Sequence, residues 1–428
     1  MDVVHERCCG LDVHKLTVVA CLLTPGTSGA PGEKGRPSKE VRTFGTMTED
    51  LLALSDWLAA AACTHVVLES TGVYWKPVWN VLEGDFALLL VNAQHVKQVP
   101  GRKTDVKDAE WLADLLRHGL VRGSFVPDQP QRELRELTRY RTAKVRERTR
   151  EVQRLQKTLE GANIKLASVA TDVTGKSARA MLAALVAGNS AGTGGDDGAH
   201  EADAPAALAE LAEGRLREKL PQLARALTGR FGAHQRFLVA EHLAQLDFLN
   251  ETIERLSGEV AERLRPFDAV LDQLDAIPGI GRWTAEVLLA ELGTDMTRFP
   301  TAKHLASWAG MCPGNHESAG KRYSGRTRKG NGALRTTLVE AAQAARRKKD
   351  CYLAAQFRRI AARRGTKKAA VAVGHSILVI VYHLLRDGTV YQDLGPAYFD
   401  RRNQAALERR LVARLEALGH TVTLAPAA

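Results

Sequence analysis

The sequence predicts a mixed α/β domain at the amino end, followed by a helical remainder. Short apolar runs alternate with helix-like segments over residues 1–128, whereas residues 129–392 show mainly helical periodicity. The length of 428 residues is too great for one ordinary compact domain. With 45% hydrophobic and 25% charged residues, the chain has the composition of a globular protein, which excludes disorder along its whole length.

The expected sheet is built from four apolar runs in the first domain. Strands are expected at residues 16–23, 41–44, 65–68 and 86–91. The first two are joined by a Gly-, Pro- and Ser-rich loop over residues 24–38, and a helix is expected to begin at Met47 or Thr48. Two strands paired across a loop and then alternating with helices indicate a mixed sheet.

Residues 129–266 are predicted to form a helical region that contains a coiled-coil seam. Apolar residues recur there at spacings of 3, 4, 3 and 4, namely Leu246, Leu249, Ile253, Leu256 and Val260. Such a seam fits a dimer contact or a helix hairpin packed within one chain equally well. Residues 187–205, rich in Gly, Ala and Asp, are expected to form a flexible surface loop.

Residues 267–392 form a third predicted domain, and residues 393–428 a terminal helix and tail. Pro278-Gly-Ile-Gly separates two helical segments, and Gly279 and Gly281 allow a sharp turn that approaches a ligand. The free N–H groups at the start of the second helix suit a phosphate. This pattern predicts a helix-hairpin-helix that binds DNA independently of sequence, with a plain turn between helices as the alternative.

Cysteine spacing and hydropathy point to a soluble cytoplasmic protein. The six cysteines contain no C-x-x-C pair, so neither a disulfide framework nor a zinc ribbon is expected. The longest apolar run, residues 369–385, is shorter than a typical membrane-spanning helix of about 20 residues. The amino terminus lacks the apolar core of a signal peptide. No membrane is therefore expected as a partner.

The positive charge of the chain is concentrated in one block. The formal net charge is +11, but residues 318–368 alone carry 16 Lys and Arg against Glu340 and Asp350. This block has a net charge of +14, which leaves −3 for the rest of the chain. A single-sign block favours contact with nucleic acid, because solvated surfaces usually mix both signs.

Four carboxylates in the first domain predict a metal site. Asp12 lies at the front of the first expected strand, Glu69 ends a buried strand, and Asp105 and Asp108 share one face at the start of a helix. Taken singly, these acids suit strand ends and helix starts. Taken together, they predict a ribonuclease-H-like nuclease fold that holds Mg²⁺, or Mn²⁺ in its place. Three neighbouring cations suit a phosphate backbone, namely Arg102, Lys103 and Lys107.

A serine within the basic block is the expected nucleophile. Ser318 and Ser324 are equal candidates on chemistry, because both lie among cations that can stabilise charge on a phosphate. A plain Gly/Ser loop that binds phosphate is the alternative. The cations expected to contact nucleic acid here are Lys321, Arg322, Arg326, Arg328, Lys329 and Arg335.

The motifs at both ends of the chain resemble the DEDD-type insertion-sequence transposases, whose members are bridge-RNA-guided serine recombinases. Three amino-terminal motifs carry the resemblance: Gly10-Leu-Asp-Val-His-Lys, Leu68-Glu-Ser-Thr-Gly-Val-Tyr and Gly101-Arg-Lys-Thr-Asp-Val-Lys-Asp-Ala. Four carboxy-terminal motifs extend it: Pro278-Gly-Ile-Gly, Trp308-Ala-Gly-Met-Cys-Pro-Gly, Glu317-Ser-Ala-Gly-Lys and Lys329-Gly-Asn-Gly-Ala-Leu-Arg. Many relatives have Ser-Gly where this chain has Ser318-Ala-Gly.

The resemblance implies a fold, a reaction and partners. It implies a ribonuclease-H-like domain resembling Holliday-junction resolvases, in which Asp12, Glu69, Asp105 and Asp108 bind metal, and it makes Ser318 the nucleophile. It also implies double-stranded DNA substrates (element ends and target), a structured non-coding guide RNA, and a homo-oligomer, either a dimer or a tetramer. The main alternative is a structure-specific endonuclease of the Holliday-junction type that uses water as nucleophile. A phosphotransferase of the actin type and a non-enzymatic DNA binder are further alternatives.

Overall fold

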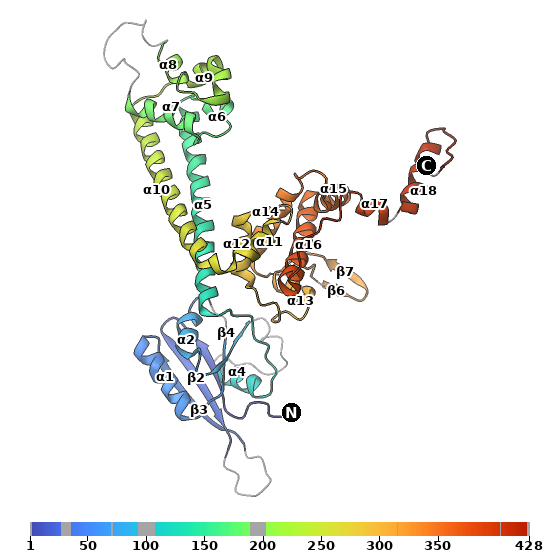
Figure 1. The fold of residues 1–428 in the computed structure, drawn as a ribbon. Helices are drawn as coiled ribbons and strands as arrows, with labels where there is room; N and C mark the ends of the chain where they lie inside the picture. The colour runs from blue at the N-terminus through green and yellow to red at the C-terminus, as the bar shows by residue number, and fades with distance from the viewer. Residues whose placement is uncertain are drawn as a thin grey trace. The chain divides into compact units, whose positions relative to one another are not determined.

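A computed structural model describes residues 2–26, 36–69, 72–92, 108–188, 203–314, 316–327, 329–402 and 404–425. The chain divides into two compact units, Met1–Pro127 and Asp128–Ala428, and each is described by itself. The ribbon in Figure 1 shows the elements of both units.

The first unit contains a five-stranded mixed sheet. Its strands are β1 (Cys8–Val13), β2 (Thr17–Thr24), β3 (Ser38–Gly45), β4 (His65–Glu69) and β5 (Ala87–Val91), in the order β3-β2-β1-β4-β5. The pairs β1–β2 and β2–β3 are antiparallel, whereas β1–β4 and β4–β5 are parallel. The predicted mixed sheet is therefore confirmed, and it fits a ribonuclease-H-like domain.

One expectation about this sheet is wrong. Residues 16–23 were expected to be the first strand, with Asp12 in front of it, but they form the second strand, and Asp12 is the fifth residue of β1. Hydropathy does not reveal β1, because Gly10 and Asp12 interrupt its short apolar run. In the structure, the edges of β1 are paired on both sides, with β2 and β4.

Helices cover both faces of this sheet. Helices α1 (Thr48–Ala60) and α2 (Trp75–Leu82) bury Leu54 and Leu82 in one cluster with the side chains of β1, β2 and β4. Helix α4 (Asp108–Arg117) buries its apolar stripe in a second cluster with Cys8, Val67 and Val91. The sheet is thus the middle of three layers, because successive strand residues point to opposite faces.

Two long helices open the second unit. Helix α5 (Gln129–Gly161) packs along α10 (Ala233–Leu264) within the same chain. Leu246, Leu249 and Val260 of the predicted seam are buried, whereas Ile253 and Leu256 are half-buried. The seam therefore serves a helix hairpin within one chain, and the dimer contact remains a prediction.

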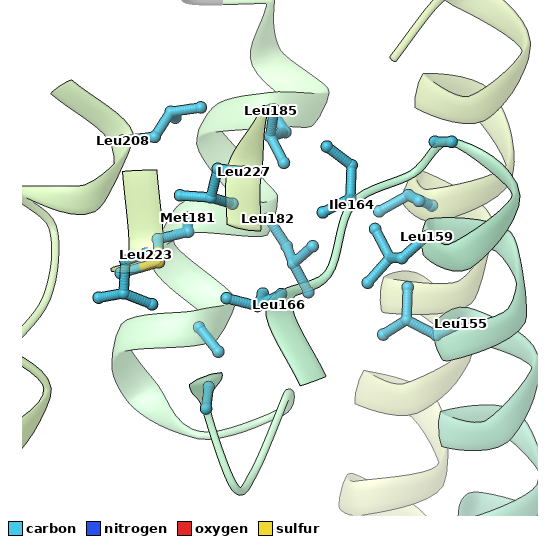
Figure 2. Close-up of a cluster of buried hydrophobic side chains, with 14 of the residues drawn as sticks. Leu155, Leu159, Ile164, Leu166, Met181, Leu182, Leu185, Leu208, Leu223 and Leu227 are labelled. Atoms are coloured by element: carbon cyan, nitrogen blue, oxygen red, sulfur yellow. The ribbon is translucent and has the colours of Figure 1, made fainter. Parts of the chain in front are cut away.

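A small helical cluster connects the two long helices. It consists of α6 (Leu166–Val169), α7 (Lys176–Ala187), α8 (Asp203–Ala209), the 3-10 turn η1 (Gly214–Lys219) and α9 (Leu220–Leu227). Figure 2 shows how Leu155, Leu159, Leu182 and Leu223 gather with their neighbours in its core. The expected loop 187–205 lies mostly outside the described residues.

The rest of the second unit packs around one apolar helix. After the 3-10 turn η2 (Arg265–Phe267) come α11 (Asp268–Asp275), α12 (Arg282–Leu292), α13 (Ala302–Trp308), β6 (His316–Ser318), β7 (Lys321–Ser324), α14 (Gly332–Ala345), α15 (Tyr352–Arg364) and α16 (Thr366–Asp387). Helices α13, α14 and α15 all pack on α16. Two further helices follow, α17 (Tyr398–Arg402) and α18 (Gln404–Glu416).

Helix α16 is also the one described helix that is long and apolar enough to cross a membrane. Its 18-residue apolar window has a mean hydropathy of 1.7, and half of that window is buried inside the protein. Val373, Ile377 and Val381 have no exposed surface, and they recur at the spacing of one helix face. The contacts with three other helices are those of a core helix.

Candidate functional site

The first candidate site lies at one end of the parallel strands. The register of β1 and β4 ends with Leu11 opposite Leu68, so Asp12 and Glu69 each follow the last pair on adjacent strands. Glu69 is half-buried and lies opposite Val91 of β5. The two carboxylates therefore lie at the same end of two adjacent parallel strands.

The third described acid, Asp108, lies on helix α4, which packs on the sheet. It is the first residue of α4, and α4 packs directly on β1. Gly10 permits this approach, because a Cβ atom there would lie 2.2 Å from the carbonyl oxygen of Ala109. The remaining predicted residues of this site fall outside the described residues, namely Arg102, Lys103, Asp105 and Lys107.

The described acids have the right chemistry for a divalent cation, but they do not complete a site. Across the parts of the chain that the structure describes, no group of three or more His, Cys, Asp or Glu could hold a metal ion. Asp12 retains 24% of its side-chain exposure, and its Oδ2 atom lies 3.1 Å from Nε2 of His14. Carboxylate oxygens are the ligands that Mg²⁺ prefers. Nothing in the sequence pattern indicates this contact between Asp12 and His14.

We expect Gly10→Ala to destabilise the first unit. The added methyl group would meet backbone atoms of Ala109 and Ala113 at 2.2 and 2.4 Å, so α4 would have to move away from β1. Overpacking of this kind typically costs about 1–3 kcal/mol. The matched control is Gly258→Ala in α10, where nothing lies within 4 Å of the added methyl group. That variant should be slightly more stable, since alanine favours helix.

The stability of both glycine variants is measured by urea denaturation, followed by circular dichroism. A Gly10→Ala protein with an unchanged midpoint would contradict the close packing of α4 on β1.

The second candidate site is a short β-hairpin in the second unit. Ser318 ends β6, and its Cα atom is paired with that of Lys321, the first residue of β7. Ala319 and Gly320 form the turn, with φ of +49° and +74°. Two successive residues with positive φ are typical of the tight turns that join antiparallel strands. Ser318 therefore lies beside the turn, next to a cation in the register, and its side chain lies outside the described residues.

The hairpin presents exposed cations. Lys321, Arg326 and Lys329 are exposed, Arg335 is half-buried on α14, and the side chains of Arg322 and Arg328 lie outside the described residues. The Oγ atom of Ser324 accepts a hydrogen bond of 3.1 Å from the backbone N–H of Arg326. Ser324 thus takes part in a local turn that holds the end of the hairpin.

The predicted glycine turn packs against a helix on one side. Gly279 has φ of +92°, and a Cβ atom there would lie 2.3 Å from the carbonyl oxygen of Ala341 in α14. This face of Gly279 serves close packing between helices, a role that the sequence analysis did not predict. Gly281 is exposed at the start of α12, and contact of this turn with nucleic acid remains a prediction.

Two of the carboxy-terminal motifs approach each other closely at their glycines. A Cβ atom on Gly330 would lie 2.4 Å from the backbone nitrogen of Gly310. Gly310 itself has φ of +67° and follows α13. The Trp308-Ala-Gly and Lys329-Gly-Asn segments can approach this closely only because neither glycine carries a side chain. Their contact fixes the loop that follows the hairpin.

A buried carboxylate also binds this loop. Glu291 of α12 has no exposed surface, and Nδ2 of Asn331 donates to its Oε2 atom at 2.6 Å. From α5, Arg139 binds both oxygens of Glu291 at 2.6 and 2.8 Å, while Nε of Arg135 lies 3.5 Å from Oε2. The Oδ1 atom of Asn331 caps α14 by accepting from Leu334 N–H. Glu291 therefore links α5, α12 and α14.

These ion pairs affect the charge states of the arginines. The hydrogen bonds from Arg139 to Glu291 raise the pKa of Arg139 above its usual value. Burial lowers the pKa of Arg135 to about 10, although the charge of Glu291 opposes this change. Both arginines therefore remain charged at neutral pH.

A second buried pair lies on the same helix. Arg141, 1% exposed, bonds Glu286 at 2.7 Å, and its guanidinium carbon lies 3.6 Å from the ring centroid of Trp283. Sequence reasoning missed both pairs. The available signal was the pair of acids in the apolar run Ala285-Glu-Val-Leu-Leu-Ala-Glu-Leu, since a buried acid requires a partner.

Two models of known protein families match the segments that contain the two candidate sites. A DEDD transposase model of IS110 elements, described as a transposase, matches residues 9–164, a range that contains all four predicted acids. A second model, described as the transposase IS116/IS110/IS902 family, matches residues 271–358, which contain Ser318 and Ser324. Together they cover more than half of the chain.

Relatives from two bacteria agree with these models. The "Insertion element IS110 uncharacterized 43.6 kDa protein" of Streptomyces coelicolor is 30% identical over 211 residues, 45% of this chain and 52% of that protein. The "Probable family 20 transposase" of Pseudomonas aeruginosa is 30% identical over 159 residues, 36% of this chain and 46% of that protein. The matches thus span about half the length of these relatives. The two family models match successive parts of the chain and together cover more than half of it. The chain therefore belongs to the IS110 family of DEDD transposases.

Proposed function

We propose that this protein is a transposase that cuts and rejoins the DNA of an insertion sequence. The observation that carries the proposal is the match of IS110-family transposase models to both units, one over the acidic sheet edge and one over the serine hairpin. The position of the acids in the fold adds support, because Asp12 and Glu69 end up on adjacent parallel strands.

We propose that the acidic edge binds divalent cations. Transposases of the DEDD type typically use such ions, and Mg²⁺ is our first candidate, with Mn²⁺ as a substitute. Asp12, Glu69, Asp105 and Asp108 would be the ligands. When bound, a pair of such ions stabilises charge on the attacking and leaving oxygens of a phosphodiester. Arg102, Lys103 and Lys107 would hold the phosphate backbone nearby.

Ser318 is our proposed nucleophile. The tight turn presents its backbone at the exposed end of a hairpin, with Lys321 as its cross-strand neighbour. In the proposed step, the Ser318 oxygen attacks phosphorus, the bond between phosphorus and the leaving oxygen breaks, and the serine proton leaves with that oxygen. A phosphoserine–DNA ester results. Attack by a DNA hydroxyl then releases Ser318, so the phosphodiester energy is retained and no ATP is required.

We propose double-stranded DNA at the element ends and the target as substrate, and a structured non-coding RNA as guide. The resemblance supports RNA guidance, and a homo-oligomer, a dimer or tetramer, is proposed on the same basis. The protein is expected to be soluble and cytoplasmic. A junction-resolving endonuclease is less well supported, because both family models describe transposases.

Recombination of two plasmids tests the proposed function. Purified protein is mixed with a donor plasmid carrying the element ends and a target plasmid, with RNA transcribed from the element's flanks. We expect joined donor–target products in Mg²⁺ and none after chelation with EDTA. Omission of the RNA should abolish joining. Cutting of branched DNA without joined products would favour the endonuclease instead.

A further inference from the structure

A second charged surface lies apart from the serine hairpin in the sequence. Residues 346–368 contain ten Lys and Arg side chains and one acid, Asp350. These residues follow α14, form α15 and begin α16, and all ten cationic side chains are exposed. Figure 1 labels the three helices. We call these ten side chains the α15 basic surface.

The α15 basic surface lacks internal neutralisation. In the part of the chain that the structure describes, none of its ten side chains forms an ion pair with a carboxylate. Some exposed arginines elsewhere in the same unit are paired, namely Arg263 with Glu133 and Glu259, and Arg217 with Glu210. A surface that mixes both signs needs no external anion, whereas this one repels itself until an anion binds.

The arginines of α15 form an exposed face. Arg359 and Arg363 are four residues apart and lie on one side of the helix, with Arg358 next to them. The opposite side buries Leu353 and Phe357. The helix has 13 residues and is therefore about 20 Å long. That length matches about six base pairs at 3.4 Å each.

The start of α16 adds an unfavourable pair of charges. Lys367 and Lys368 occupy the first turn of this helix, which contains no acid. A helix start carries partial positive charge, so cations there cost free energy, whereas an external anion would be stabilised. Binding of a polyanion at this helix start would therefore offset the unfavourable charges of Lys367 and Lys368.

We propose that the α15 basic surface binds the phosphate backbone of duplex DNA. Backbone contact fits the chemistry, because the surface consists of Lys and Arg that match phosphate without reading bases. This inference rests on the proposed function, since it assigns to a transposase a second grip on its DNA. The inference names the residues that would hold the DNA while Ser318 of the hairpin attacks it.

The salt dependence of DNA binding tests the proposal. A fluorescent 20-base-pair DNA duplex of arbitrary sequence is titrated with the full-length protein at several salt concentrations, followed by anisotropy. For the triple variant Arg358→Ala, Arg359→Ala and Arg363→Ala, the slope of log K against log salt should weaken by about 2.7. This value is three lost contacts at about 0.9 each. Alanine favours helix, so the circular dichroism spectrum should not change.

A charge-matched control removes three exposed cations elsewhere in the unit. Arg215→Ala, Lys219→Ala and Arg225→Ala change the net charge equally, and these positions lie in the helical cluster between α5 and α10. Their slope should stay at the wild-type value. Equal slopes for both triple variants and wild type would overturn the proposal, as would equal weakening by both triples. The proposal would also be overturned if the α15 triple variant lost binding only to an RNA duplex of the same length.

Cleavage at saturating DNA separates this proposal from the proposed function. The control triple variant should cleave at the wild-type rate. If wild-type protein fails to cleave while the slopes differ as expected, the proposed function fails and the DNA-binding surface stands.

Discussion

Replacing Asp12 by Asn is expected to reduce DNA cleavage at least about 100-fold. Asp12 lies in the middle strand of the sheet, next to the strand that ends in Glu69, and a metal ion contributes several kcal/mol of charge stabilisation in phosphodiester chemistry. Each 1.36 kcal/mol corresponds to a factor of ten in rate. Asparagine preserves size and one oxygen, so DNA affinity should be retained. Initial cleavage rates on a labelled DNA substrate in Mg²⁺ measure the effect.

The matched control for this carboxylate is Asp114→Asn on α4. Its side chain is 56% exposed and lies 3.5 Å from His118, away from the proposed ligands in sequence. It makes the same change of charge in the same unit, and its cleavage rate should equal that of wild type. Wild-type activity of Asp12→Asn would remove the metal-binding role of the acidic edge.

Replacing Glu291 by Ala is expected to destabilise the second unit by about 3–5 kcal/mol. The carboxylate has no exposed surface and binds Arg139 and Asn331, with Arg135 close by. Removing one partner of a buried ion pair leaves the other charges unpaired, which accounts for the large cost. The loop that follows the serine hairpin would also lose its link to α5. The urea midpoint of unfolding measures the effect.

An exposed ion pair provides the comparison for Glu291. Glu213 binds Lys176 at 2.7 Å, but the two side chains are 58% and 81% exposed. Glu213→Ala should therefore change the midpoint little, since solvent screens such pairs. If Glu291→Ala and Glu213→Ala unfold at the same urea concentration, the buried network does not stabilise the unit.

The sequence predicts those features that depend on local pattern. Apolar runs locate β2, β4 and β5, and acids at the ends of such runs predict the edge where Asp12 and Glu69 lie on adjacent strands. The family resemblance follows from short motifs in a fixed order. Strand β1 escapes prediction because Gly10 breaks its pattern, although the same glycine allows α4 to approach the sheet.

Features that depend on distant contacts are not predictable from the sequence. Glu291 meets Arg139 across 152 positions, and no periodicity indicates which buried acid pairs with which arginine. Gly279 lies in a Pro-Gly-Ile-Gly segment whose residues are typical of a turn that faces a ligand. Only the folded chain brings α14 against this glycine. Ser318 and Ser324 have equal chemistry in the sequence, and the hairpin distinguishes them only by placing Ser318 beside the turn.

Trapping a covalent protein–DNA adduct tests the central claim most directly. Wild-type protein, Ser318→Ala and Ser324→Ala are each incubated with labelled element-end DNA and guide RNA in Mg²⁺, and the products are separated under denaturing conditions. We predict a labelled adduct for wild type and Ser324→Ala and none for Ser318→Ala, with peptide mapping placing the DNA on Ser318. An undiminished adduct in Ser318→Ala would contradict the account.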